Sequence, residues 1–509
     1  MLAWTIYISF LGVLVLMLLP KGNAALARGV ALLTALIGLG IGIAGLVQYS
    51  SANTADGAKR IVEVANPEWI PSLGIHYHLA ADGISITLVL LTGLAAVAGI
   101  LFSWNIESRA KEFFAFYLAL IGGVYGVFLS FDLFLLFVFY EIAIVPKYFI
   151  IAIWGSTRRE YGAMKLALYS FVGSAMVLVG LIAAYVVSGA HSFDLTDLAK
   201  YSYPQSFQMW AFPVVFIGFA ILAGMWPFHT WAPTGHVAAP TAASMLLAGV
   251  VMKLGAYGCL RVAMTLFPDG LAAWKYFFAI LAIIGIVYGA MVALVQKDFK
   301  FVIGYSSVSH MGFVLLGLMT LNTIGLSGAV LQMFSHGVIA GLLFAVVGRM
   351  VYERTHTREL DVLQTMGLVK VIPFAAVTFV IASMASMGLP GFSGFAAEFQ
   401  IIIGAWQAFP TLAVITGLGI LIGVAYTLRA MIKAFFGETA EGAAAPVSHE
   451  SSAGEHHTDH CPPISFPEKL GAVLLIGVSL LIGLFPSLLL NVIKPSFESP
   501  LFDWLRRLQ

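Results

Sequence analysis

Long apolar stretches recur along the whole chain, with polar residues confined to short segments between them. A helix needs about 20 mainly apolar residues to cross roughly 30 Å of hydrocarbon. Residues 280–295 have almost no polar face, whereas a helix in the core of a large soluble protein would show one. The pattern therefore predicts an all-α, multi-pass membrane protein with about 14 spans. We place these spans near residues 2–19, 26–48, 81–103, 113–130, 133–155, 164–188, 209–231, 239–264, 273–295, 301–320, 325–351, 371–404, 411–436 and 469–493.

Two of the predicted helices, the seventh and the twelfth, are interrupted by residues that disfavour helix. Trp-Pro-Phe-His-Thr-Trp-Ala-Pro occupies 226–233, and Gly-Leu-Pro-Gly-Phe-Ser-Gly occupies 388–394. Each interruption falls in about the fourth helix of a five-helix set, as in transporters built from two inverted repeats with discontinuous helices. Ordinary proline kinks are the alternative, because no clear letter-by-letter repeat accompanies the pattern.

The same pattern divides the chain into five parts. Residues 1–112 hold helices 1–3 with an outside loop, 113–264 a first repeat (helices 4–8), and 265–436 a second, inverted repeat (helices 9–13). A histidine-rich cytoplasmic loop, expected to be flexible, follows at 437–467, and 468–509 hold helix 14 and a tail.

Basic residues gather in the connections that follow odd-numbered helices. Because positively charged short loops stay in the cytoplasm, both termini are expected outside. The residues that set this orientation are Lys21, Arg28, Arg109, Lys111, Arg158, Arg159, Lys297, Lys300, Arg354, Arg358, Arg429 and Lys433.

Composition excludes several classes of protein. Of the 509 residues 60% are hydrophobic and 10% charged, against about 25% charged in a soluble domain. The 26 basic and 25 acidic residues leave a net charge of +1, so no basic surface for nucleic acid is expected. With two cysteines, Cys259 and Cys461, the chain alone cannot build a four-cysteine zinc or iron–sulfur site. Any redox cofactor would belong to another polypeptide.

Ionisable residues inside the predicted spans are the strongest functional signal. Each costs at least about 2.5 kcal/mol on insertion scales and therefore needs a partner, water or a function. Carboxylates, lysines and histidines on five helices can form a chain of titratable groups, and this predicts a proton relay. A single buried histidine would more simply be structural. The predicted relay residues are Glu141, Lys147, Lys253, His310, His336 and Glu398. Asp82 and Asp132 lie nearer helix starts, where interfacial anchoring is the simpler expectation.

Other chemistry has weak support. The chain contains no GxSxG elbow, Walker loop or HExxH pattern. The loop at 437–467 could bind a transition metal, but its alanines, serines and prolines offer nothing to fix ligand geometry, so a flexible acidic loop is the simpler interpretation. Its candidate ligands are His449, Glu450, Glu455, His456, His457, Asp459, His460 and Cys461.

Several motifs resemble one family of membrane subunits, and the likeness covers roughly residues 75–436. They are Phe139-Tyr140-Glu141 with Val145-Pro146, Trp226 to Trp231, Ala239 to Ala242, Leu247 to Gly249, Ser306 to Phe313 and Tyr352 to Arg358. Together they resemble the antiporter-like subunit M of bacterial proton-pumping NADH:quinone oxidoreductase, respiratory complex I. The last two motifs favour subunit M over subunits L and N and over Mrp-type antiporters.

The resemblance implies 14 helices with two inverted five-helix repeats and no cofactor in this chain. It implies that NADH, FMN, iron–sulfur clusters and quinone are held by partner subunits, whose quinone reduction drives proton movement here. The implied partners are L-like and N-like antiporter subunits of the membrane arm, and the implied location is the bacterial cytoplasmic (inner) membrane.

The family's functional residues fall on Glu141, Lys253, His310, His336 and Glu398, the last at the exit side. One position departs, because the family's helix-7 lysine is replaced by Leu222. The family's Pro-Asp-Ala-His also becomes Pro-Thr-Gly-His at 233–236, and Lys147 occupies a position that is usually apolar in the family.

Three hypotheses follow from these departures. In the first, a pumping subunit has moved its lysine from helix 7 to helix 5, so that Lys147 points toward the space near Leu222 and pairs with Glu141. In the second, loss of the helix-7 lysine leaves a structural, non-pumping subunit. In the third, the chain serves a related hydrogenase or an Mrp-type cation/proton antiporter complex.

Overall fold

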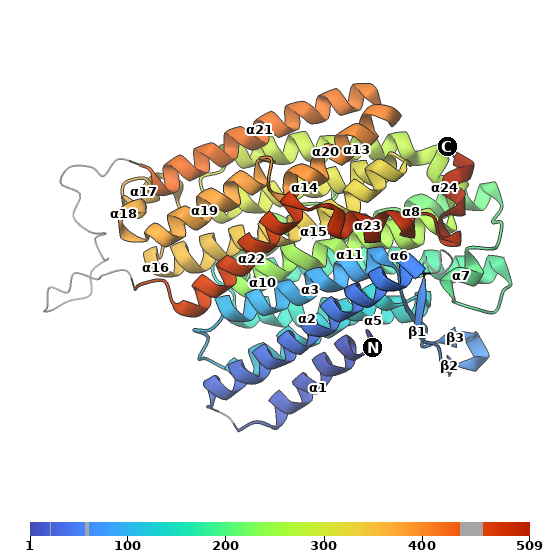
Figure 1. Cartoon of the computed structure of the whole chain (residues 1–509), viewed down its shortest axis with the longest axis horizontal. Helices are drawn as coiled ribbons and strands as arrows, with labels where there is room; N and C mark the ends of the chain where they lie inside the picture. Colours follow the sequence, from blue (N-terminus) through green and yellow to red (C-terminus); the bar gives the residue numbers. More distant parts are fainter. Residues whose placement is uncertain (21, 56–60, 438–461, 509) are drawn as a thin grey trace, which may run out of the picture.

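Long helices lying side by side form the body of the molecule, as the computed structural model shows (Figure 1). The structure describes residues 1–20, 22–55, 61–437 and 462–508. Within these ranges, 12 helices are long and apolar enough to cross a membrane, and α1 (Trp4–Leu18) and α19 (Pro373–Ser386) are shorter apolar helices. The predicted all-α, multi-pass architecture is therefore confirmed, whereas the count of 14 and the inverted repeats stay predictions.

Two of the first helices, α3 and α5, begin at a capping aspartate. Asp82 accepts from Ser85 N at the start of α3, and Asp132 accepts from two backbone N–H groups at the start of α5. Both aspartates are fully buried, so they cap helices inside the protein and do not anchor them at an exposed interface. The helices of this part are α2 (Ala24–Ala55), α3 (Gly83–Phe102), α4 (Ala110–Leu129), α5 (Leu133–Trp154) and α6 (Arg159–Ser188).

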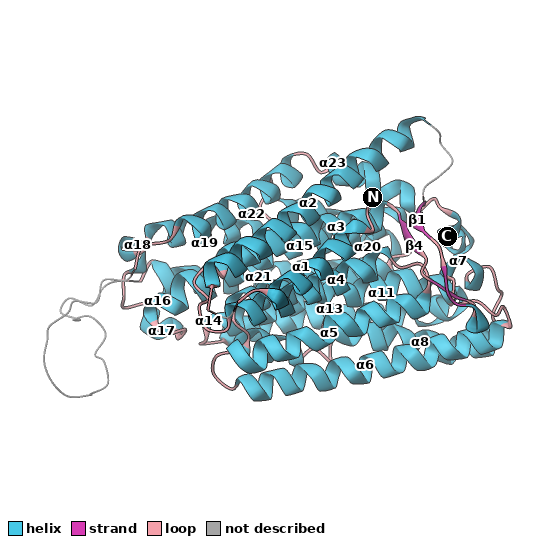
Figure 2. Cartoon of the chain, turned by 90° about the horizontal axis from the view of Figure 1, so that it is seen from below, coloured by secondary structure: helices cyan, strands magenta, loops and turns pink. Residues whose placement is uncertain are grey.

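Short strands gather at one end of the bundle. In antiparallel pairs, β1 (Val62–Ala65) joins β4 (Leu79–Ala81) and β2 (Glu68–Ile70) joins β3 (Ile75–His76), with η1 (Pro71–Leu73) between β2 and β3. The short helix α7 (Leu195–Leu198) lies at the same end, and both termini are also directed toward it (Figures 1 and 2).

Both predicted interruptions are true breaks between separate helices. The chain leaves α8 (Gln205–Ala223) at Gly224, whose φ of +82° favours glycine, and resumes helix at α9 (Trp231–Ala238) after a cis Trp226–Pro227 bond. It leaves α19 similarly through Gly388 and Gly391, with φ of +73° and +101°, before α20 (Ser393–Ala408). The prediction of discontinuous helices 7 and 12 is confirmed.

The eighth span is continuous but contains two π-helical segments on either side of a short α-helical piece. It runs through α10 (Thr241–Leu246), η2 (Leu247–Val251), α11 (Met252–Gly258), η3 (Cys259–Ala263) and α12 (Met264–Leu266). The eleventh span is α15 (Thr323–Ala345), extended by the π-helical η4 (Val346–Tyr352) and by α16 (Glu353–Thr355). Such π segments occur frequently at functional sites.

The remaining elements complete the bundle and its C-terminal end. The predicted last helix at 469–493 is divided, because Pro486 has no N–H to continue the ladder. These elements are α13 (Pro268–Val295), α14 (Phe299–Met319), α17 (Leu360–Leu363), α18 (Leu368–Val371), α21 (Pro410–Phe435), α22 (Phe466–Leu484), α23 (Ser487–Ser496), η5 (Pro500–Phe502) and α24 (Asp503–Leu508).

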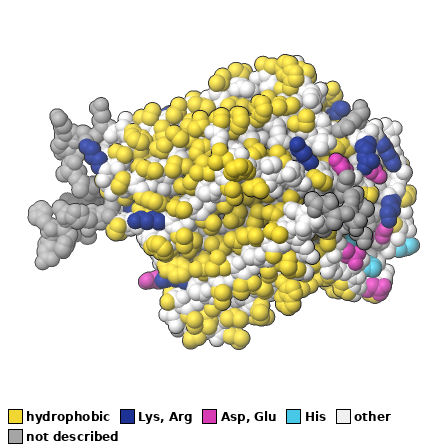
Figure 3. Space-filling view, in the orientation of Figure 1, with side chains coloured by type: hydrophobic (Ala, Val, Ile, Leu, Met, Phe, Trp, Pro, Cys, Tyr) yellow, Lys and Arg dark blue, Asp and Glu magenta, His cyan; other side chains and the backbone are white. Residues whose placement is uncertain are grey.

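Burial separates central helices from peripheral ones. The most apolar window of α3 is 94% buried and those of the eighth and eleventh spans 100%, against 39% for α6 and 28% for α21. Hydrophobic side chains cover the long face of the molecule, and charged ones gather toward its two ends (Figure 3). This surface suits lipid or apolar partner helices around the sides.

Candidate proton-relay site

The centre of the site is a contact between the eighth and eleventh spans. Lys253 on α11 is fully buried, and its Nζ lies 2.7 Å from His336 Nδ1 on α15. Lys253 also donates to the carbonyl of Ala248. That carbonyl lies in η2, so the π-helical segment supplies an acceptor for the buried lysine.

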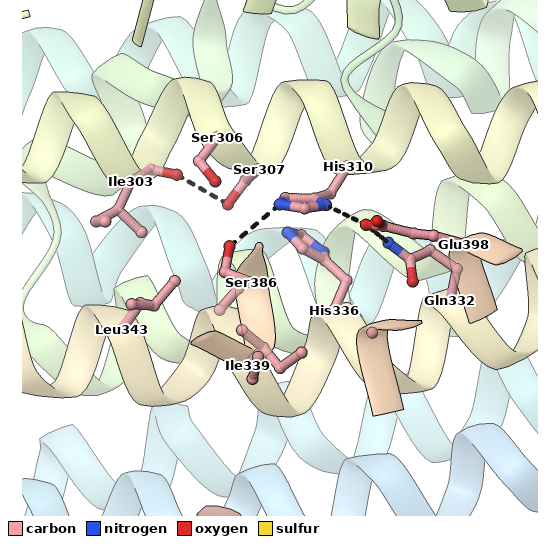
Figure 4. Close-up of a pocket in the computed structure, with 13 residues that line it drawn as sticks. Ile303, Ser306, Ser307, His310, Gln332, His336, Ile339, Leu343, Ser386 and Glu398 are labelled. Carbon is pink, nitrogen blue, oxygen red and sulfur yellow. Dashed lines mark hydrogen bonds and ion pairs between the residues drawn. The ribbon is translucent and has the colours of Figure 1, made fainter. Parts of the chain in front are cut away.

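A second contact joins the tenth span to the second half of the broken twelfth. His310 Nδ1 lies 2.9 Å from Glu398 Oε1, and His310 Nε2 lies 3.2 Å from Ser386 Oγ at the end of α19 (Figure 4). Gln332 on α15 donates to the same Glu398 oxygen over 3.1 Å. Four helices, α14, α15, α19 and α20, therefore contribute to holding this carboxylate and imidazole in place.

The two contacts meet in one cavity. The rings of His310 and His336 lie 5.5 Å apart between centroids, and both line a cavity together with Ser306, Ser307 and Glu398 (Figure 4). Each of these groups can donate or accept hydrogen bonds in at least one protonation state. Lys253, His336, His310 and Glu398 consequently form a row of titratable groups across four helices.

The remaining two predicted residues lie together on α5, apart from this row. Lys147 is fully buried and donates to Ser170 Oγ on α6 over 3.3 Å. Glu141 is half-buried, faces Ser174 on α6 and is close enough to Lys147 for a charge–charge interaction. Its Oε1 atom is buried and has no hydrogen-bond partner among the described residues. Helix α6 therefore contacts both charged groups.

Leu222 lies in the last turn of α8, one residue before the helix ends. Its side chain is 1% exposed. The neighbouring carbonyl of Ile221 accepts a 2.7 Å hydrogen bond from the Trp231 indole on α9, which ties the two halves of the broken helix together. An apolar side chain thus occupies the position where the resemblance would place a lysine.

Sequence reasoning missed a buried ion pair eight residues after Lys253. Arg261 in η3 and Asp82 are both fully buried, with Arg261 Nη2 2.6 and 2.7 Å from the two Asp82 oxygens. Arg261 also donates to Tyr257 Oη over 3.2 Å and lies over the rings of Phe131 and Phe502. An arginine inside a predicted apolar span was the available signal.

Two further buried basic groups also escaped prediction. The sequence pattern predicts a loop position for Lys300, but this side chain is 2% exposed inside α14, and its Nζ donates to the carbonyl of Ala239 over 3.0 Å. His236 on α9 is fully buried, and neither ring nitrogen has a hydrogen-bond partner in the part of the chain that the structure describes. The Pro-Thr-Gly-His motif contained this histidine, but its environment was not predictable.

A polar cluster outside the spans joins the strands to α7. His78, between β3 and β4, contacts the Asp194 carboxylate, and its Nε2 lies 3.9 Å from Glu63. Burial alone would lower the pKa of His78, but the hydrogen bond to Asp194 and the charges of Asp194, Glu63 and Asp132 outweigh it and raise that pKa above 6.5. Burial would likewise raise the pKa of Asp194, yet the bonds from His78 and Thr196 lower it below 3.8.

The histidine-rich stretch lies outside the described residues, so its predicted ligands at 449–461 have no structural account. Among the residues that are described, no group of three or more His, Cys, Asp or Glu side chains could hold a metal ion.

The family model described as "NADH:quinone oxidoreductase/Mrp antiporter, TM" matches residues 130–423. NADH-quinone oxidoreductase subunit M of Rhodobacter capsulatus is 38% identical over 446 residues, covering 85% of this chain and 83% of that protein. The subunit M of Rickettsia prowazekii (strain Madrid E) is 36% identical over 512 residues, covering 98% of each chain.

Solved structures extend the likeness to three dimensions. A chain of respiratory complex I from Thermus thermophilus with bound NADH is 27% identical, with a TM-score of 0.86 and 100% of both chains covered. A chain of the Mrp complex from Dietzia sp. DQ12-45-1b is 20% identical, with a TM-score of 0.82, covering 100% of this chain and 98% of the other, and shows a shared fold. The resemblance drawn from the motifs is confirmed: this chain belongs to the NADH:quinone oxidoreductase/Mrp antiporter family of membrane subunits.

Proposed function

We propose that this chain is a proton-translocating membrane-arm subunit of NADH:quinone oxidoreductase. The observation that carries the proposal is the row from Lys253 to His336, His310 and Glu398. Polar contacts of 2.7 and 2.9 Å join its ends, and in the middle the two histidine rings lie 5.5 Å apart between centroids at an interplanar angle of 32°. The names of the relatives point to the same complex. Quinone reduction would occur in partner subunits, which would hold NADH, FMN and the iron–sulfur clusters.

In this proposal Lys253 gives a proton to the row of titratable groups, and Glu398 releases it at the other end. A buried lysine can give its proton to an adjacent neutral imidazole, and His336 Nδ1 is placed to receive it. The two facing imidazoles then pass the proton to the Glu398 carboxylate, which Gln332 holds in position. Glu398 serves as the exit residue because it belongs to the second half of a broken helix.

Glu141 and Lys147 form the second unit of the proposal. Lys147 supplies the positive charge that the family places on helix 7, and its charge acts on Glu141 from the same helix. A change in the proton load of this pair would alter the field at Lys253 and drive transfer along the row.

One observation favours a second candidate, a structural subunit that does not pump. Leu222 is 1% exposed in the last turn of α8, so the position expected to bear a lysine is closed by an apolar side chain. An antiporter-like role in a hydrogenase or Mrp complex has less support, since the family description covers Mrp antiporters but the Mrp chain is only 20% identical.

Orientation, partners and domain limits complete the proposal. Both termini would face outside, which the position of both chain ends on one side of the bundle supports (Figures 1 and 2). L-like and N-like subunits would cover part of the apolar flank. The divisions at 1–112, 113–264, 265–436, 437–467 and 468–509 would describe two inverted five-helix repeats with their flanking segments.

The deciding experiment is Lys253→Met in the assembled complex, with the proton-to-electron ratio measured in inverted membrane vesicles. The row predicts a lower ratio, because His336 loses the group that loads it. Gln48→Leu, an exposed position in the last third of α2, a helix that contributes no residue to the row, is the control. An unchanged ratio and rate in Lys253→Met would refute the relay and favour the structural candidate.

A further inference from the structure

Two serines on α6 contact the charged pair of α5, although serine in an apolar helix is not by itself a functional signal. Ser170 and Ser174 are 2% and 4% exposed, so both hydroxyls are inside the protein. Lys147 Nζ donates to Ser170 Oγ over 3.3 Å, and Glu141 faces Ser174. The charged groups are therefore linked to α6 at two adjacent positions.

The antiparallel packing of α5 and α6 explains this correspondence. Four residues, 155–158, join the two helices, so the chain reverses and ascending positions on α5 face descending positions on α6. From Glu141 to Lys147 is an advance of about 9 Å along the α5 axis, and from Ser174 back to Ser170 is an advance of about 6 Å along α6 in the same direction. Residues four apart lie on one helical face, so the two serines present a single polar edge toward α5.

The lysine and the carboxylate cannot meet directly along an unbroken helix. Six residues turn the helix by about 240°, so Lys147 does not stack over Glu141. The serines fill this gap on the neighbouring helix. We infer that Ser170 and Ser174 form a hydroxyl bridge that carries the proton between Lys147 and Glu141. Helix α6 then makes the connection to Glu141 that α8 cannot make, because α8 carries Leu222 where the resemblance implies a lysine.

The transfer balances without any redox partner. The Lys147 ammonium gives a proton to Ser170 Oγ as the Ser170 hydroxyl proton moves to a bridging water, and that water gives a proton to Ser174 Oγ. The Ser174 hydroxyl proton then moves to Glu141. At the end Lys147 and Glu141 are neutral, and the water and both serines again hold their original number of protons.

Ser174 can switch its hydrogen-bond acceptor. Its hydroxyl donates to the Phe171 carbonyl over 3.2 Å, while the Glu141 carboxylate is close enough to act as a second acceptor. Glu141 Oε1 is buried with no partner among the described residues, so it is available to receive this bond. Rotation of one hydroxyl would therefore open or close the bridge.

This inference rests on the proposed function, and the experiment separates the two. The variants are Ser170→Ala with Ser174→Ala, and Ser170→Thr with Ser174→Thr, which restores both hydroxyls. Ser188→Ala is the control, since Ser188 lies on the same helix and donates to its own backbone at Tyr185. Proton-to-electron ratio and its pH profile are measured in vesicles containing the assembled complex, after confirming equal complex content.

The double alanine variant should reduce pumping about tenfold, with the threonine variant closer to the parent and Ser188→Ala unchanged. Normal pumping in the double alanine variant, with loss of pumping in Lys147→Met, would overturn the bridge and leave the proposed function intact. Normal pumping in Lys147→Met would overturn the proposed role of the pair itself. Equal loss in the alanine and threonine variants would also overturn the bridge, because side-chain volume and not the hydroxyl would then be responsible.

Discussion

Replacing Lys147 by methionine tests whether this lysine stands in for the one that Leu222 replaces. Methionine keeps the length and apolar character of the stem but removes the charge. Lys147 and Glu141 contact serines one helical turn apart on α6. If the axial rise of about 9 Å between the two residues is taken as the separation of their charges, the attraction is about 2 kcal/mol at an effective dielectric constant of about 20.

A change of about 2 kcal/mol shifts the proton equilibrium of the pair roughly 30-fold. Lys147→Met should therefore abolish the contribution of this subunit to pumping, while quinone reduction slows only as far as the two processes are coupled. The assay is the proton-to-electron ratio in inverted vesicles, with complex content checked by NADH oxidation using an artificial acceptor.

Adding Leu222→Lys to Lys147→Met provides the rescue. The double variant recreates the arrangement that the resemblance implies, with the lysine on α8, and should recover part of the ratio. Leu222→Lys alone is the control, because it adds a second buried cation whose burial is costly. Normal pumping by Lys147→Met would refute the reasoning, and absence of any rescue would show that the two backbone positions are not interchangeable.

Three further outcomes are expected. Glu398→Gln should lower the pumping rate at least about tenfold in vesicles, because the amide cannot accept a proton at the end of the row. Arg261→Ala should lower the thermal stability of the assembled complex by about 3 to 5 kcal/mol, because Asp82 is left buried and unpaired. Adding Asp82→Asn should recover part of that loss, and equal melting temperatures for all three proteins would contradict the assignment. The contact between His78 and Asp194 should hold the strands to α7 in the pH range where the Asp194 carboxylate is ionised and the His78 imidazole is protonated. This range lies between the lowered pKa of Asp194 and the raised pKa of His78. The stabilisation from this contact is complete between pH 3.8 and 6.5, is lost as pH falls through the lowered pKa of Asp194, and is lost as pH rises through the raised pKa of His78. Amide exchange near β4 should therefore increase as pH rises through the raised pKa of His78, and His78→Asn should remove this dependence.

Much of the architecture was predictable because its signals are local. A run of apolar residues indicates a span whatever surrounds it, and proline with glycine interrupts a helix by steric rules, so both broken helices were found. The replacement of the family's helix-7 lysine by Leu222 could equally be read from the sequence. Membership in the family followed from motifs, each of which lies within a short stretch.

The partners of the ionisable residues were less predictable. The contact of His310 with Glu398 joins positions 88 residues apart, and its register depends on how α14 and α20 pack. The pattern predicts a loop position for Lys300 because it follows Lys297 at the edge of an apolar run, yet packing of α9 against α14 covers its side chain. Ser170 gave no signal, since a serine in an apolar helix more often bonds to its own backbone.

Placing the lysine on α5 changes how the charged pair could be switched. In the arrangement that the resemblance implies, glutamate and lysine lie on different helices, so a relative movement of those helices changes their separation. Here Glu141 and Lys147 share one helix, and a rigid movement of α5 leaves their spacing unchanged. Only side-chain rotation, local adjustment at Pro146 or movement of α6 can alter the interaction. If the pair acts as proposed, movement of α6 would take the role in switching that the resemblance gives to α8, because α6 contacts both residues.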